Sequence, residues 1–174
     1  MEGEKNMKNT EQSLRKNLKV GIIICMSLIC ICLSILFLMP NEAKPYYSVS
    51  AEERELLARL VHCEASTESQ ECRMAVASAV FNRLDAGYWG DTLYDVIHYP
   101  YAFTPVLYNA LYDWEVDERD YEAVDYVIWN GPTIPTYVRY FRADYDHQWE
   151  DYANYCILDT TYFGYFINWE RGEW

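Results

Sequence analysis

The sequence predicts an α+β fold, in which a mainly helical body carries a small antiparallel sheet and follows one transmembrane helix. Apolar residues recur at helical spacing over residues 51–64 and 74–84. Residues 136–143 alternate in polarity, and residues 160–167 are rich in β-branched and aromatic side chains, as is typical of strands. Residues 20–39 contain no charged side chain, and a bilayer-spanning helix needs about 20 apolar residues.

The N-terminal region is expected to anchor the chain. The run over 20–39 exceeds the roughly 7 to 15 residues of a signal-peptide core, which favours an uncleaved, single-pass membrane anchor. Basic residues of the preceding segment, 1–19, abut the run, so this segment should be a cytoplasmic tail. Residues 40–49 form a linker, and the domain over 50–174 should then lie outside the cytoplasm, at the cell membrane. Secretion after signal cleavage is the alternative.

The remaining elements follow from cap signals. Ser50 and Glu53 have the spacing of a capping box at the start of the first domain helix. A short helix is expected over 92–97. Asp117 can cap a further helix that closes at Asn130, directly before a Gly-Pro pair.

Charge excludes one class of partner. The chain has a net charge of −13, and residues 1–19 hold five basic and three acidic side chains, so residues 20–174 carry −15. Nucleic acids require clustered Lys and Arg, so they are excluded as partners. The 17 tyrosines and 6 tryptophans could stack on sugar rings, although such residues also suit the core and rim of a small exported domain.

Glu64 stands where an apolar stripe requires an apolar residue. Leu57, Leu60 and Val61 fall at positions i, i+3 and i+4, and Glu64 is at i+7. A helix that simply ended there would leave Glu64 exposed. A carboxyl on the apolar side of a helix end is instead desolvated, which favours its protonated form and suits a general acid.

Four motifs occur in a specific order over about residues 52–166. They are HCEASTESQECRMAVASAVFNRL, TLYDVIHYPYAFTPV, YVRYFRADYDHQW and TYF. In this order they resemble the SleB/CwlJ cell wall hydrolases, a family that includes spore cortex-lytic enzymes. The resemblance implies a lysozyme-like arrangement beside a glycan groove, with peptidoglycan glycan strands as the partner and no cofactor.

The resemblance also implies site residues. Glu64 matches the family's catalytic acid, which cleaves the MurNAc–GlcNAc bond. The expected substrate-binding residues are Phe103, Thr104, Tyr140, His147 and Trp149. Two positions depart from the family pattern: Ala102 stands where many members have Gln, and Thr161 where relatives often have His. These two departures are expected to affect how the substrate is positioned, and not the identity of Glu64 as the catalytic acid.

Most glycosidases need a second carboxylate. The candidates in this sequence are Glu68, Glu71, Asp91, Asp95 and Asp144. None lies in a motif comparable to that of Glu64. Members of the family are lytic transglycosylases, which need one glutamate, so we predict Glu64 to be the sole catalytic carboxylate.

The sequence leaves two alternative functions. A zinc-dependent N-acetylmuramoyl-L-alanine amidase would need ligands from His62, His98, His147 and the cysteines of the domain, but no H-E-x-x-H or paired C-x-x-C motif occurs. No metal is therefore predicted. A catalytically weak glycan-binding or assembly module is the non-enzymatic alternative. The sequence leaves protein partners unknown and does not separate vegetative wall from spore cortex.

The domain has an odd number of cysteines, so not all can pair. Cys63 and Cys72 flank the turn between two expected helices, which makes them a candidate disulfide. Cys156 is expected to be unpaired.

Overall fold

The structure is a computed structural model that describes residues 2–38, 43–143 and 152–167. The chain divides into two compact units, Met1–Ala43 and Lys44–Trp174. The first unit contains one helix, α1 (Glu2–Leu38). A search of the described residues finds no helix with the length and apolarity that crossing a membrane requires. The predicted anchor at residues 20–39 is thus not confirmed.

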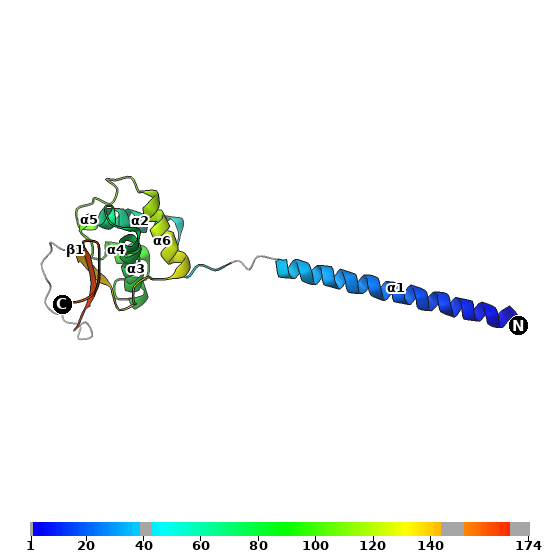
Figure 1. The fold of residues 1–174 in the computed structure, drawn as a ribbon. Helices are drawn as coiled ribbons and strands as arrows, with labels where there is room; N and C mark the ends of the chain where they lie inside the picture. Colours follow the sequence, from blue (N-terminus) through cyan, green and yellow to red (C-terminus); the bar gives the residue numbers. More distant parts are fainter. Residues whose placement is uncertain (1, 39–42, 144–151, 168–174) are drawn as a thin grey trace. The chain divides into compact units, whose positions relative to one another are not determined.

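In the part of the second unit that the structure describes, five helices form the body: α2 (Ala51–Ala65), α3 (Gln70–Ala86), α4 (Leu93–His98), α5 (Thr104–Leu107) and α6 (Glu118–Asn130). Figure 1 shows these helices gathered together, with the sheet on one side of them. The predicted capping box of α2 is confirmed, because Glu53 N donates to the Ser50 hydroxyl and Ser50 N donates to the Glu53 carboxylate, both at 3.1 Å. Asp117 caps α6 as predicted.

A three-stranded antiparallel sheet completes the unit. It contains β1 (Tyr140–Ala143), β2 (Tyr152–Leu158) and β3 (Thr161–Phe166) in the order β1-β3-β2. The predicted α+β class is confirmed for this unit. Strand β2 was not anticipated from the sequence. β1 begins later than expected, because Val138 N donates to Pro135 O and so closes a turn before it.

Helix α3 is the central helix of the body. Its residues from Ala75 to Arg83 are all buried, and it contacts α2, α4, α6 and β1. Three of the buried residues, Ala75, Ala77 and Ala79, have small side chains. Asn82 donates to the carbonyls of Pro135 and Val138 at 2.9 and 2.8 Å, which fixes the turn that leads into β1. The central helix therefore sets the position of the sheet edge.

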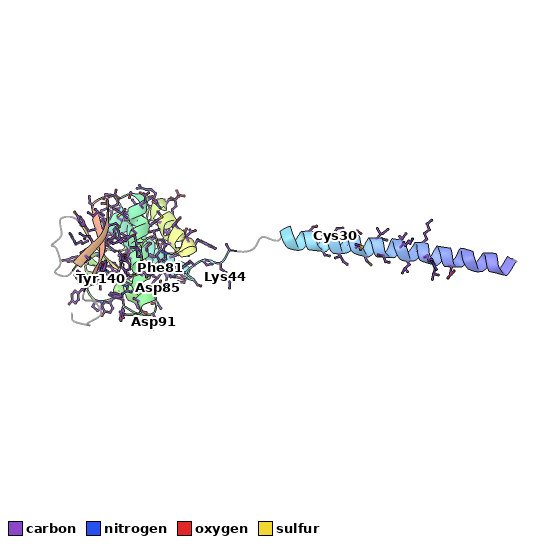
Figure 2. All side chains as sticks on the ribbon, turned by 60° about the horizontal axis from the view of Figure 1, so that its bottom comes forward. Cys30, Lys44, Phe81, Asp85, Asp91 and Tyr140 are labelled. Atoms are coloured by element: carbon purple, nitrogen blue, oxygen red, sulfur yellow. The ribbon has the colours of Figure 1, made fainter. Side chains whose placement is uncertain are left out.

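The cysteines are all free thiols in the structure, so the predicted Cys63–Cys72 disulfide is not formed in it. The two thiols face different surroundings. Cys63 Sγ donates to Ala110 O at 3.8 Å, whereas Cys72 is fully buried at the start of α3 and its thiol contacts Thr161. Burial raises the pKa of both thiols, that of Cys72 to about 11. Cys156 is a free thiol in the structure, and Cys30 on α1 is an exposed thiol (Figure 2).

Candidate active site

A cleft of about 650 Å³ lies where the end of α2 meets the segment around α5 and the sheet. Its walls come from α2, α3, the segment 101–114, β1 and β3. The capped start of α2 and the buried α3 hold the first two walls in place. Glu64 lies in this cleft and is half-buried. Among the lining residues that the structure describes, it is the one carboxylate.

The surroundings of Glu64 are more polar than the apolar stripe predicted, because a buried arginine acts on it. Arg83 lines the cleft and is only 5% exposed. Burial lowers the pKa of Arg83 to about 10, while electrostatic interactions with Tyr140 and Glu64 act in the opposite direction. The guanidinium therefore keeps its positive charge at neutral pH and interacts with the Glu64 carboxylate.

Aromatic rings and one carbonyl hold Arg83 in place. Its Nε donates to Arg139 O at 2.7 Å. Its guanidinium carbon lies 4.6, 5.3 and 5.6 Å from the ring centres of Phe103, Tyr140 and Trp89. Such cation–π contacts orient a cation without neutralising it. Arg83 is therefore fixed in the cleft by both α3 and the start of β1.

The predicted substrate-binding residues fall into three groups. Phe103 and Thr104 line the cleft with Glu64, although the Phe103 ring is almost buried under Arg83. Tyr140 does not line it; its ring packs edge-on against Phe166 at 4.7 Å, and its role in the structure is to support Arg83. His147 and Trp149 lie outside the described residues.

The other acidic candidates have structural partners or lie at the surface. Glu68 accepts from Thr160 Oγ1 at 2.8 Å and so holds the turn between β2 and β3. Asp95 belongs to the capping box of α4. Glu71 and Asp91 are exposed, the latter at the edge of the unit in Figure 2. None of these four lines the cleft; Asp144, next to the lining residue Ala143, is outside the described residues.

Two of the three histidines of the amidase hypothesis are among the described residues, and they have different partners. His62 Nδ1 is 2.8 Å from the Asp120 carboxylate, and His98 Nδ1 donates to Tyr94 O at 2.9 Å. Among the described residues, the one group with metal-ligand spacing is Glu68, Cys72 and Asp159. It contains no histidine and does not line the cleft.

Several residues of the cleft are not predicted by the sequence motifs. Arg83 and Arg142 contribute two guanidinium groups. The positions of both family departures, Ala102 and Thr161, also line the cleft, so these substitutions change its surface directly. Three of the other missed residues are exposed aromatics: Tyr101, Tyr108 and Trp114.

The helical unit with its small sheet and a polar cleft that holds Glu64 has the form of a candidate enzyme active site. A sequence profile of the Cell Wall Hydrolase family matches residues 67–163, more than half of the chain. The chain belongs to this family. No match was found among curated proteins.

Two solved structures share the fold. The catalytic domain of SleB from Bacillus cereus matches with a TM-score of 0.61 and 21% identity, covering 72% of this chain and 98% of that domain. The catalytic domain of the germination-specific lytic transglycosylase SleB from Bacillus anthracis matches with a TM-score of 0.60 and 21% identity, covering 72% of this chain and 99% of that one. Family membership supports peptidoglycan as the substrate.

Proposed function

We propose that this protein cleaves the MurNAc–GlcNAc bond of peptidoglycan as a lytic transglycosylase, with Glu64 as the general acid and then the general base. The observation that carries the proposal is that no described residue of the cleft besides Glu64 is a carboxylate. Hydrolases with two carboxylates place them about 5 to 9.5 Å apart across the scissile bond. A one-glutamate reaction needs no such partner.

In the proposed reaction Glu64 donates its proton to the glycosidic oxygen, and the bond from that oxygen to the muramic anomeric carbon breaks. The 6-hydroxyl of the same muramic acid attacks the anomeric carbon and gives its proton to the Glu64 carboxylate. The products are a sugar with a free hydroxyl and a 1,6-anhydromuramic end, and no water is consumed. Arg83 favours the ionised carboxylate, which suits its second role as the base.

Mass spectrometry of digested peptidoglycan tests this proposal. Anhydromuramic ends without reducing muramic ends are expected, and their release should be insensitive to a metal chelator. Reducing ends would show hydrolysis instead. Free peptides released in a chelator-sensitive reaction would show the amidase, and binding of peptidoglycan without any soluble product would show the glycan-binding module.

Replacing Arg83 by Met should move the alkaline limb of the pH–rate profile upward by about one pH unit. Arg83 favours the ionised form of the neighbouring Glu64. Without this cation, the carboxyl keeps its proton to higher pH, so a reaction that needs the protonated acid persists there. Arg83→Lys keeps the charge and should retain the wild-type profile. Equal losses of activity in both variants with unmoved profiles would mean that Arg83 only supports the fold.

We also propose that the domain acts outside the cytoplasm, held by a membrane anchor at residues 20–39. The uncharged run with its basic flank supports this location. Protease added to cells stripped of their wall should digest the protein from about residue 50 onward. Complete protection of the domain would contradict the orientation, and a shortened form beginning near residue 44 would show a cleaved signal instead.

A further inference from the structure

Three aromatic side chains of the cleft are left largely in solvent. Tyr101, Tyr108 and Trp114 are 87%, 75% and 63% exposed, and all three line the cleft that holds Glu64. These three residues form the aromatic rim of the cleft. Single exposed aromatic residues are common on proteins. Three in one cleft, on a single segment of 14 residues, are a concentration that the core does not require.

The backbone that carries the first two rings is held tightly. Ala102 N donates to Tyr99 O at 3.0 Å, and Ala110 N donates to Pro105 O at 2.8 Å. Tyr101 has φ 62°, a left-handed conformation that is unfavourable for a bulky residue. In the free protein the exposed Tyr101 ring gains almost no burial that would offset this strain. Strain of this kind collects at functional sites.

Helix α2 holds the backbone that carries the third ring. Arg59 donates to Trp114 O at 3.3 Å, and its guanidinium lies 5.0 Å from the ring centre of Tyr112. Arg59 is itself held by Glu55, at 2.7 Å. The segment around Trp114 is therefore ordered through its backbone, while the indole remains available. Binding to a preorganised surface loses less conformational entropy than binding to a mobile one.

We infer that the aromatic rim binds the sugar rings that adjoin the scissile bond, so that the enzyme prefers long glycan strands over short ones. This inference rests on the proposed function for its substrate. Aromatic faces stack on the C–H faces of sugars, and the Tyr hydroxyl and Trp N–H can bond sugar hydroxyls or acetamido groups. Stacking is also independent of charge, which suits a domain with a large negative charge.

Binding is measured by calorimetry in the Glu64→Gln background, with soluble octasaccharides and tetrasaccharides of alternating GlcNAc and MurNAc as the probes. Trp114→Ala and Tyr108→Ala should each weaken octasaccharide binding about 3- to 10-fold and change tetrasaccharide binding less. With Glu64 restored, each variant should raise KM more for long strands than for short ones. Trp129→Ala and Tyr126→Ala, at exposed aromatics of α6 outside the cleft, are the matched controls and should bind normally.

Tyr101 allows a test that separates binding from folding. Tyr101→Gly removes the ring and relieves the left-handed strain, so the melting temperature should be unchanged or higher while octasaccharide binding weakens. Tyr101→Phe keeps the stacking face and should restore binding. Normal octasaccharide binding by all three rim variants would overturn the inference and leave the proposed function intact. Weakened binding together with reducing product ends would support the rim and refute the transglycosylase reaction.

Discussion

Glu64→Gln should lower the turnover of peptidoglycan by at least about 10⁴-fold while leaving binding almost unchanged. General acid–base assistance is worth about 10²- to 10⁴-fold, and this variant loses both the acid and the base step. Glutamine keeps the shape and the hydrogen-bonding capacity of the side chain but has no transferable proton. Release of soluble muropeptides, measured beside sedimentation with insoluble peptidoglycan, checks both halves of the expectation.

The controls for this variant are the other carboxylates. Amide replacements of Glu68, Glu71, Asp91 and Asp95 should cost far less, because none of these residues lines the cleft. Asp144→Asn is the most informative control, since this residue follows Ala143 of the cleft wall. If Asp144→Asn abolishes cleavage as completely as Glu64→Gln, and the products carry reducing ends, the one-glutamate mechanism is wrong.

The helices were predicted well because the hydrogen bonds that cap them join residues that are close in the sequence. The cap residues Ser50 and Asp117 satisfy backbone groups within three residues of themselves, so their effect is visible in the sequence. Strand β2 was missed because its residues, YANYCIL, have no regular alternation, and the ladder with β3 contains an irregularity between Asn154 and Cys156. Pairing across the sheet, rather than local pattern, decides that strand.

The site was only partly predictable for a related reason. Glu64 was found because it falls seven residues after Leu57 on an apolar stripe. Arg83 likewise falls seven residues after Val76 and three after Val80, on the apolar stripe of α3. A charged residue on this stripe is a signal that could have identified Arg83. That the two residues meet in one cleft depends on the crossing of α2 and α3, which no local pattern gives. The aromatic rim depends similarly on the turns at Tyr101 and Asn109, both with positive φ.

Asp120→Ala should destabilise the protein by about 3 to 5 kcal/mol, the largest stability effect expected for a single polar substitution here. Asp120 and Arg73 are both fully buried and form an ion pair between α6 and α3. Asp120 also accepts from Asp117 N at 3.0 Å and from His62 Nδ1 at 2.8 Å. Removing the carboxylate leaves the Arg73 cation buried, with the Ser66 carbonyl as its remaining bonded partner in the structure. Urea unfolding of the full chain gives the free energy directly.

A double variant shows whether the loss of stability comes from the lost ion-pair attraction or from the buried Arg73 cation that is left without its carboxylate partner. Because the cost of Asp120→Ala comes from the buried Arg73 cation, Arg73→Met combined with Asp120→Leu should be less destabilising than Asp120→Ala alone. Arg119→Ala is the matched control, because Arg119 pairs with Asp117 at 3.2 Å on the same helix but at the surface. Its loss should cost less than about 1 kcal/mol. An Asp120→Ala variant no less stable than Arg119→Ala would show that water or a rearranged partner neutralises Arg73, and that the pair does not hold α3 against α6.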